Sequence, residues 1–187
     1  MLLAVLQGMA QPLEEHLRLQ FCFESVSGKT VTDSVSGIKA TLMSQASVVS
    51  FGQHHAMDLG SQGGYLSMTR NAGAVVRDLT DLTVSVCYRL EPGATLTGNG
   101  YFLWCFSQSS ANSETASPYL GYRLNAQRLA ISTGGWANET GMQVGTPSVS
   151  GRWVHALYRQ KGQTAELFLD GKLAAKATGL VTPATAF

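Results

Sequence analysis

The sequence predicts an all-β protein with antiparallel sheets packed as a sandwich. Segments of alternating polar and apolar residues recur along the chain, and turn-forming residues separate them. The segment from Gly151 to Lys176 reads as strand, turn, strand, tight turn and strand. Charged residues make up only 13% of the chain, and runs of Ala, Glu and Lys that favour helices are absent. Short strands with frequent turn signals are typical of a β-sandwich or jelly roll.

The C-terminal segment gives the clearest strand signal. One face of its first strand carries Trp153, His155, Leu157 and Arg159, and the other carries Val154, Ala156, Tyr158 and Gln160. The alternation resumes from Ala165 to Leu169 after a break at Lys161-Gly162-Gln163. Asp170-Gly171 then predicts a type I′ hairpin turn, because both central residues of that turn need a positive φ.

The first half of the chain predicts a series of short strands. Leu17–Glu24 alternates, with Leu17, Leu19, Phe21 and Phe23 on one face and Arg18, Gln20, Cys22 and Glu24 on the other. A polar loop over residues 25–37 separates this strand from the next ones. Those strands are expected at residues 38–43, 47–51, 56–59 and 65–69, followed by a short helix or turn at 72–79.

The second half continues the pattern. Residues 82–90 predict a strand whose core side carries Leu82, Val84, Val86 and Tyr88. Residues 101–107 form a fully apolar strand between two loops, at 91–100 and 108–118. Residues 119–125 and 129–133 are expected to pair, and residues 134–150 to be mostly loop with a short strand near 142–144.

The length and charge of the chain limit the classes of protein to which it can belong. A chain of 187 residues suits one domain, predicted over residues 11–187. Residues 1–10 resemble the tail of a signal peptide, which predicts a secreted, periplasmic or cell-surface bacterial protein. No other stretch is apolar enough to span a membrane. The formal net charge of +1 gives no reason to expect a nucleic acid as partner.

The three cysteines do not suggest a metal site. Cys22, Cys87 and Cys105 each fall in a predicted strand, and no Cys-x-x-Cys pattern occurs. We expect buried free thiols that pack as small apolar side chains. A Cys22–Cys87 disulfide is the alternative in an exported protein.

The residues of the chain do not predict a catalytic centre. The twelve acidic residues are scattered, whereas a glycosidase needs two carboxylates facing one cleft. Asp78 and Asp81 are three residues apart, so a strand would place them on opposite faces. No Gly-x-Ser-x-Gly motif occurs, and His54 and His55 have no neighbouring acid or cysteine to complete a zinc site.

Several motifs resemble those of laminin-G-like (LamG) domains, which have the concanavalin A-type jelly roll. The resemblance extends from about Leu17 to Lys176, and it rests on the pattern from Trp153 to Lys172 and on three earlier pieces: Leu19–Glu24 with Asp33, Asp58–Leu66 and Leu79–Ser85. It implies a further closing strand after the last residues, so we expect this chain to be part of a longer protein. It also implies an exposed sheet edge beside Leu17–Glu24.

A narrower resemblance points to one LamG subtype. The segments are Gly100–Ser107, Tyr122–Arg128 and Ser132–Trp136, and they are similar to LamG domains attached to secreted bacterial family 43 glycoside hydrolases. Such enzymes act on arabinan- and xylan-type polysaccharides. The resemblance therefore implies a partner catalytic domain in the same longer protein. It also implies a possible structural calcium, for which Glu24, Asp33 and Asp58 are the acidic residues near the expected places.

Sugar-binding modules combine aromatic rings with amide and charged side chains. We expect Trp104, in an apolar strand, to lie in the core, and Trp136, in a glycine-rich loop, to be at the surface. The remaining residues of the predicted ligand-binding set are Tyr119, Tyr122, Arg123, Asn125, Arg128, Asn138 and Glu139.

The hypothesis that follows is a non-catalytic module that binds a polysaccharide or oligosaccharide for a secreted polysaccharide-degrading enzyme. The alternative is a structural, adhesion or protein-interaction module that binds no sugar.

Overall fold

The structure is a computed structural model that describes residues 13–77, 79–96, 102–107, 118–145, 147 and 150–180. The chain forms two compact units, Met1–Val75 and Val76–Phe187. The predicted signal-peptide tail at residues 1–10 lies outside the described residues, as does most of the loop predicted at 108–118. The single domain predicted over residues 11–187 stays a prediction. Among the described helices, none has the length and hydropathy needed to cross a membrane.

The first unit contains two small antiparallel sheets. One sheet has the order β1-β2-β3-β6, built from Val26–Ser27, Thr30–Thr32, Lys39–Met43 and Tyr65–Ser67. The other is the hairpin of β4 (Ser47–Phe51) and β5 (His54–Asp58). A short helix precedes the strands, α1 (Leu13–His16), and α2 (Thr69–Val76) follows them. Val31, Leu42 and Ala46 form the buried centre of this unit.

The prediction of a strand at Leu17–Glu24 is wrong, but the prediction of which side chains share each face is confirmed. No residue of this segment is in a strand, and Phe23 has a positive φ of 63°, which an extended chain does not adopt. Its backbone instead bonds to the turn after β2, where the amide of Ser34 donates to the carbonyl of Gln20 at 2.9 Å. Even so, Phe21 and Phe23 pack against the buried centre. The sheet edge expected here is therefore not present.

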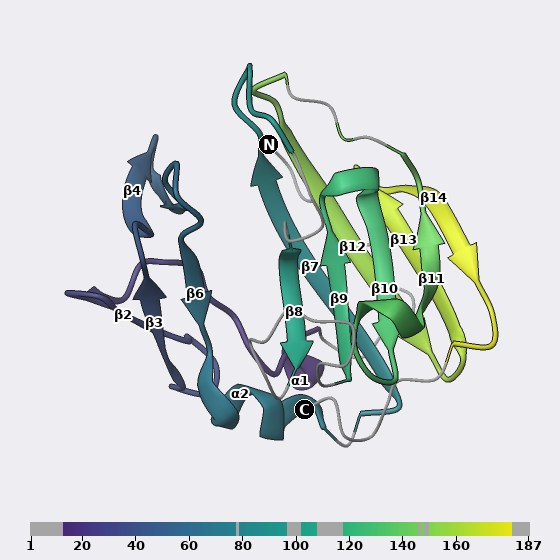
Figure 1. The fold of residues 1–187 in the computed structure, drawn as a ribbon. Coiled ribbons are helices and arrows are strands. Elements are labelled where there is room, and N and C mark those ends of the chain that lie inside the picture. Colours follow the sequence, from purple (N-terminus) through teal and green to yellow (C-terminus); the bar gives the residue numbers. More distant parts are fainter. Residues whose placement is uncertain are drawn as a thin grey trace, which may run out of the picture. The chain divides into compact units, whose positions relative to one another are not determined.

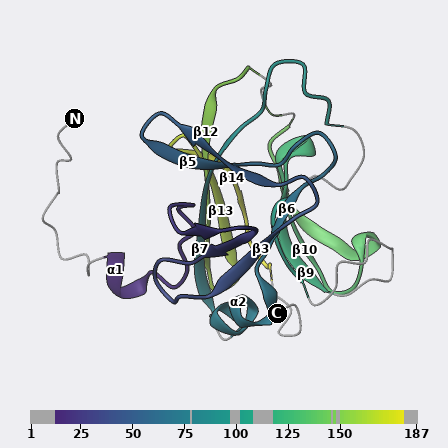
Figure 2. The ribbon, with the colours of Figure 1, turned by 90° about the vertical axis from the view of Figure 1, so that its left-hand side faces the viewer.

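The second unit is a two-layered antiparallel sandwich (Figure 1). One layer has the order β11-β10-β9-β8, built from Glu139–Gln143, Arg128–Ser132, Tyr119–Arg123 and Phe102–Ser107. The other has the order β14-β13-β12-β7, built from Lys172–Ala177, Thr164–Leu169, Trp153–Lys161 and Asp81–Arg89. Figure 2, turned by 90°, separates β9 and β10 from β7, β12 and β13.

The core of the second unit lies between these layers, and the predicted faces are confirmed. Val154, Ala156 and Tyr158 of β12 pack in the same apolar cluster as Leu120, Tyr122 and Leu124 and as Leu129 and Ile131. On β7, Leu82 and Tyr88 are buried in the cluster, and Val84 packs against it. The predicted turn is also confirmed, because Asp170 and Gly171 have φ values of 48° and 76°.

All three cysteines are free, but two are not buried as expected. Cys22 is exposed in the segment that does not form a strand, and Cys87 is exposed on the outer face of β7. Cys105 of β8 is partly buried, and burial raises the pKa of its thiol to about 12. The small-apolar role expected of these residues therefore fits Cys105 alone.

Candidate carbohydrate-binding site

The loop between β10 and β11 presents the most exposed tryptophan of the described chain. It runs from Ser132 to Glu139 and contains the 3₁₀ turn η2 (Trp136–Asn138). Trp136 is 43% exposed, as its place in a glycine-rich loop predicted. Trp104, by contrast, packs against the core with its ring centroid 5.6 Å from that of Tyr158. The loop therefore offers one broad apolar ring to solvent.

Hydrogen bonds within the loop fix its conformation. Ser132 Oγ accepts from the amide of Gly134 at 3.0 Å and donates to the carbonyl of Gly135. Asn138 Nδ2 donates to the carbonyl of Gly134 at 2.6 Å. Gly135 has a φ of 67° and precedes η2, so a residue with a side chain would be strained there. These bonds constrain the backbone of the loop on both sides of Trp136.

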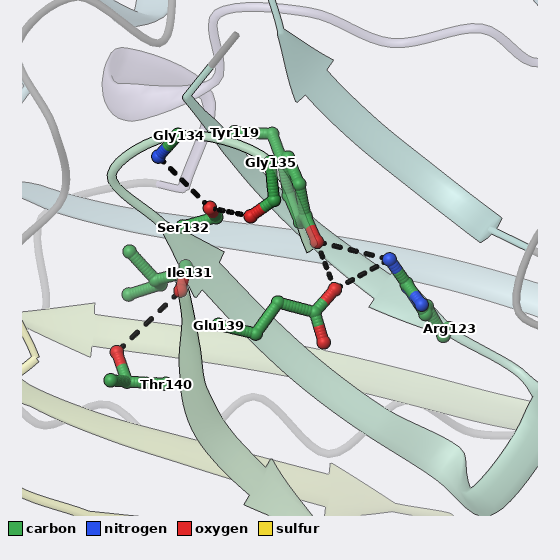
Figure 3. Close-up of polar contacts among 8 residues, drawn as sticks. All are labelled: Tyr119, Arg123, Ile131, Ser132, Gly134, Gly135, Glu139 and Thr140. Atoms are coloured by element: carbon green, nitrogen blue, oxygen red, sulfur yellow. Dashed lines mark hydrogen bonds and ion pairs between the residues drawn. The ribbon is translucent and has the colours of Figure 1, made fainter. Parts of the chain in front are cut away.

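A buried polar network lies directly beside this loop (Figure 3). Arg123 Nη2 lies 2.5 Å from Glu139 Oε1 and donates to the hydroxyl of Tyr119 at 3.0 Å. The same Tyr119 hydroxyl donates to Glu139 Oε1. The Arg123 and Glu139 side chains are only 2% and 9% exposed, so this ion pair is almost completely removed from water. We name Tyr119, Arg123 and Glu139 the buried triad.

Strand register brings the triad together. Ser132 pairs with Tyr119 on one side and with Glu139 on the other, so all three lie in one row at the end of the sheet. Arg123 is four residues along β9 from Tyr119 and shares its face, because side chains alternate along a strand. Its long side chain extends back along β9 to reach the row. The triad thereby attaches the first residue of β11 to β9.

Aromatic packing surrounds the Arg123 guanidinium. Its carbon lies 4.6 Å from the centroid of the Phe102 ring and 5.9 Å from that of Tyr119, and the two rings meet edge to face. Gly121 makes this possible, since a Cβ at that position would lie 2.6 Å from the Phe102 ring. Cation–π contact with a desolvated ring partly compensates the guanidinium for lost water.

Burial also affects the tyrosine of the triad. The pKa of Tyr119 is raised well above its ordinary value, first by burial and then by the neighbouring Glu139 carboxylate, to which it donates. The phenol therefore stays protonated throughout the neutral range and acts as a fixed donor to Glu139.

The structure divides the predicted ligand-binding set into separate groups. Trp136 and Asn138 are exposed on the loop, and Tyr119, Arg123 and Glu139 form the triad beneath it. Tyr122 is fully buried in the core, where no ligand reaches its ring. Asn125 opens the 3₁₀ turn η1 (Asn125–Gln127) at the other end of β9, and Arg128, described only by its backbone, follows that turn.

The three acidic residues considered for calcium each contact different partners. Glu24 pairs with His55 at 2.7 Å, and Asp58 accepts from the amide of Gly60 at 2.9 Å. The Asp33 carboxylate accepts from the amides of Gln20, Val35 and Ser36 and from the Ser36 hydroxyl. Burial raises the pKa of Asp33, but these donors together lower it below its ordinary value. Within the described ranges no group of three potential ligands occurs, and calcium stays a prediction.

Sequence reasoning missed three residues that shape this site. Ser132 fixes the loop, Phe102 covers the guanidinium, and Gly121 gives Phe102 its space. Ser132 and Phe102 lie in segments that carry the narrower LamG resemblance, so the signal was present. Their roles depend on cross-strand neighbours, which the sequence alone does not reveal.

Comparison with known proteins agrees with this fold. The chain is similar to domain 4 of a GH43 extracellular arabinanase from Geobacillus stearothermophilus, determined in complex with arabinotriose. The TM-score is 0.58 over 80% of this chain and 70% of that one, at 11% sequence identity. The two share a fold. At this identity the similarity does not extend to individual site residues.

A second structure resembles the chain more weakly. An S-layer domain-containing protein from Clostridium thermocellum matches with a TM-score of 0.44 and 18% identity, over 89% of this chain and 75% of that one. This similarity does not establish a shared fold. No protein-family model matches the sequence, and no curated protein matches it either.

Proposed function

We propose that this chain is a non-catalytic carbohydrate-binding module of an exported polysaccharide-degrading glycoside hydrolase. Its ligands are arabinan- or xylan-type chains, and catalysis resides in another domain of the same longer protein. The observation that carries the proposal is the half-exposed Trp136 on a loop already fixed by hydrogen bonds. The LamG resemblance of Ser132–Trp136 supports it, as does the shared fold with an arabinanase domain determined with arabinotriose.

The loop has the chemistry that sugar binding requires. An exposed indole ring can stack on the apolar face of a sugar, and nearby polar groups can bond its hydroxyls. Asn138 uses one Nδ2 hydrogen for Gly134, which leaves its other hydrogen and its amide oxygen for a ligand. Because the loop is held in place beforehand, binding loses little conformational entropy.

Titration of the full chain with arabinotriose and xylotriose by isothermal calorimetry tests the proposal. We expect one of these sugars to bind and Trp136→Ala to weaken binding at least tenfold, because the stacking surface is lost. Trp153→Ala is the matched control, since Trp153 is also exposed, at 37%, but lies on β12. The Trp153→Ala variant should bind the sugar as tightly as the wild type does. Absence of binding by the wild type, or equal losses in both variants, would contradict the proposal.

A structural or protein-interaction module is the second candidate, and exposed apolar side chains on the first unit favour it. Val49 and Phe51 are exposed on one face of β4, and the cross-strand pair Met43 and Tyr65 is exposed on the sheet that contains β3 and β6. Exposed apolar residues that adjoin on one strand or strand pair can mark a surface that a partner covers. This candidate predicts that neither sugar binds. It also predicts that Val49→Ser with Phe51→Ser abolishes association with the rest of the longer protein.

A further inference from the structure

The outer face of the β12–β14 layer carries a groove whose lining is mostly basic. It has a volume of about 420 Å³ and is lined by Arg159, Lys161, Thr164, Glu166 and Lys176. All five residues belong to β12, β13 and β14 in the second unit. The groove lies on the layer opposite the one that carries the buried triad.

Strand pairing places the charged groups in two adjacent rows. Arg159, Glu166 and Lys176 are direct cross-strand neighbours over β12, β13 and β14. Lys161 pairs with Thr164 on β13 and with Asp81 on β7. Asp81 Oδ1 accepts from the amide of Gly162 at 2.8 Å, at the margin of the groove. Three cations therefore face one lining carboxylate and one marginal carboxylate, in a chain whose net charge is only +1.

Glu166 contacts two of the cations. Its Oε2 accepts from Arg159 Nε at 3.0 Å and Nη2 at 2.5 Å, and its Oε1 lies 3.2 Å from Lys176 Nζ. The Arg159 guanidinium also lies over the Phe168 ring at 5.3 Å. These contacts bring the two positive groups together around one carboxylate. Arg159 Nη1 and two hydrogens of Lys176 have no acceptor in the described contacts.

We infer that this groove binds the carboxylate groups of an anionic polysaccharide, such as a chain of uronic acids. Guanidinium and ammonium groups recognise carboxylates through charge-assisted hydrogen bonds. The choice of a glycan over other anions rests on the proposed function. A nucleic acid fits less well, because the net charge of the chain is only +1, whereas domains that bind a polyphosphate are usually strongly basic.

The test is a titration of the full chain with trigalacturonate at pH 7 in 20 mM NaCl. Lys161→Gln with Lys176→Gln should weaken binding roughly tenfold, since two solvated charge contacts are lost. The matched control is Lys39→Gln with Lys172→Gln, which removes the same charge from exposed positions outside the groove. It should bind like the wild type. Raising NaCl to 300 mM should weaken binding of the wild type, because salt screens such contacts.

Other ligands separate the possible explanations. The methyl ester of trigalacturonate lacks the charges and should not bind. The inference is overturned if the wild type does not bind trigalacturonate, if the control pair weakens binding as much as the groove pair, or if the ester binds equally. It is also overturned if single-stranded DNA of equal charge binds more tightly. Trp136→Ala should leave trigalacturonate binding unchanged, and the groove variant should leave neutral-sugar binding unchanged, so this inference and the proposed function can fail separately.

Discussion

Two arginine–glutamate pairs, one on each layer of the sandwich, have the same shortest N–O distance but different surroundings. Arg123 with Glu139 and Arg159 with Glu166 both place Nη2 2.5 Å from a carboxylate oxygen. The first pair is 2% and 9% exposed, whereas Arg159 in the second is 55% exposed. The interatomic distance alone therefore does not reveal what either pair contributes.

Exposure to solvent determines how much each ion pair contributes to stability. A buried ion pair has lost its hydration, so each member depends on the other, and removing one leaves an uncompensated charge. A solvated pair exchanges its partner for water at little loss. We therefore assign the buried pair a structural role, linking the start of β11 to β9 across the intervening β10. The solvated pair leaves its cations accessible to a ligand.

The largest expected effect comes from breaking the buried pair. Glu139→Gln should lower the free energy of unfolding by about 3–5 kcal/mol, because Arg123 would keep a buried and unbalanced charge. Denaturant unfolding followed by circular dichroism measures this change. In the control, Arg123→Met with Glu139→Leu should lose clearly less than Glu139→Gln alone, since no charge remains buried. A loss below about 1 kcal/mol for Glu139→Gln would show that the pair is effectively solvated.

An intermediate effect is expected at alkaline pH, where buried tyrosines lower the stability of the fold. Burial raises the pKa of Tyr119, Tyr122 and Tyr158 above the ordinary value of a phenol. Their contribution to stability is complete below about pH 10, where folded and unfolded phenols are both protonated. Above that pH the unfolded chain loses these protons first, so the free energy of unfolding should fall as pH rises.

Absorbance at 295 nm, recorded beside unfolding curves from pH 8 to 11, follows these phenols. The chain has six tyrosines. Four of them, Tyr88, Tyr119, Tyr122 and Tyr158, are buried and should ionise only when the chain unfolds. Ionisation of all six at pH 10 in a chain that is still folded would contradict their burial.

The smallest expected effect is at the solvated pair. Glu166→Gln should leave the unfolding midpoint nearly unchanged in 500 mM NaCl, with a small loss in 20 mM NaCl. Hydrogen bonds from Arg159 and Lys176 lower the pKa of Glu166. Its small contribution is therefore present above the ordinary pKa of a glutamate and disappears as the pH falls through the lowered value. If Glu166→Gln lowered the free energy of unfolding as much as Glu139→Gln, the solvated pair would contribute as much to stability as the buried pair, which would contradict the proposed difference.

Sequence patterns predicted the faces of strands well because burial follows a period of two. The faces of β7 and β12 were correct, and so was the inward side of Leu17–Glu24, although that segment is not a strand. The Asp170-Gly171 turn was predictable because it depends on two adjacent residues. Local alternation therefore predicted the inward faces of β7, β12 and Leu17–Glu24, but not β9, where both faces are buried.

The buried triad was only partly predictable. Its members were all in the predicted ligand-binding set, but nothing local shows that Tyr119 meets Glu139, twenty residues later in the chain. That contact requires the register of β10 with both of its neighbours. For the same reason Asn125 and Arg128, close to Arg123 in sequence, lie at the end of β9 away from Trp136.

We propose that the Trp136 loop is a sugar-binding surface whose backbone is constrained by its own hydrogen bonds. The chain has three tryptophans, so a ¹H–¹⁵N spectrum should show three indole N–H signals, from Trp104, Trp136 and Trp153. Adding arabinotriose to the full chain should shift the Trp136 signal, assigned from the Trp136→Ala spectrum, and leave the other two unchanged. A Trp136 signal that does not move while another indole signal shifts would contradict the claim.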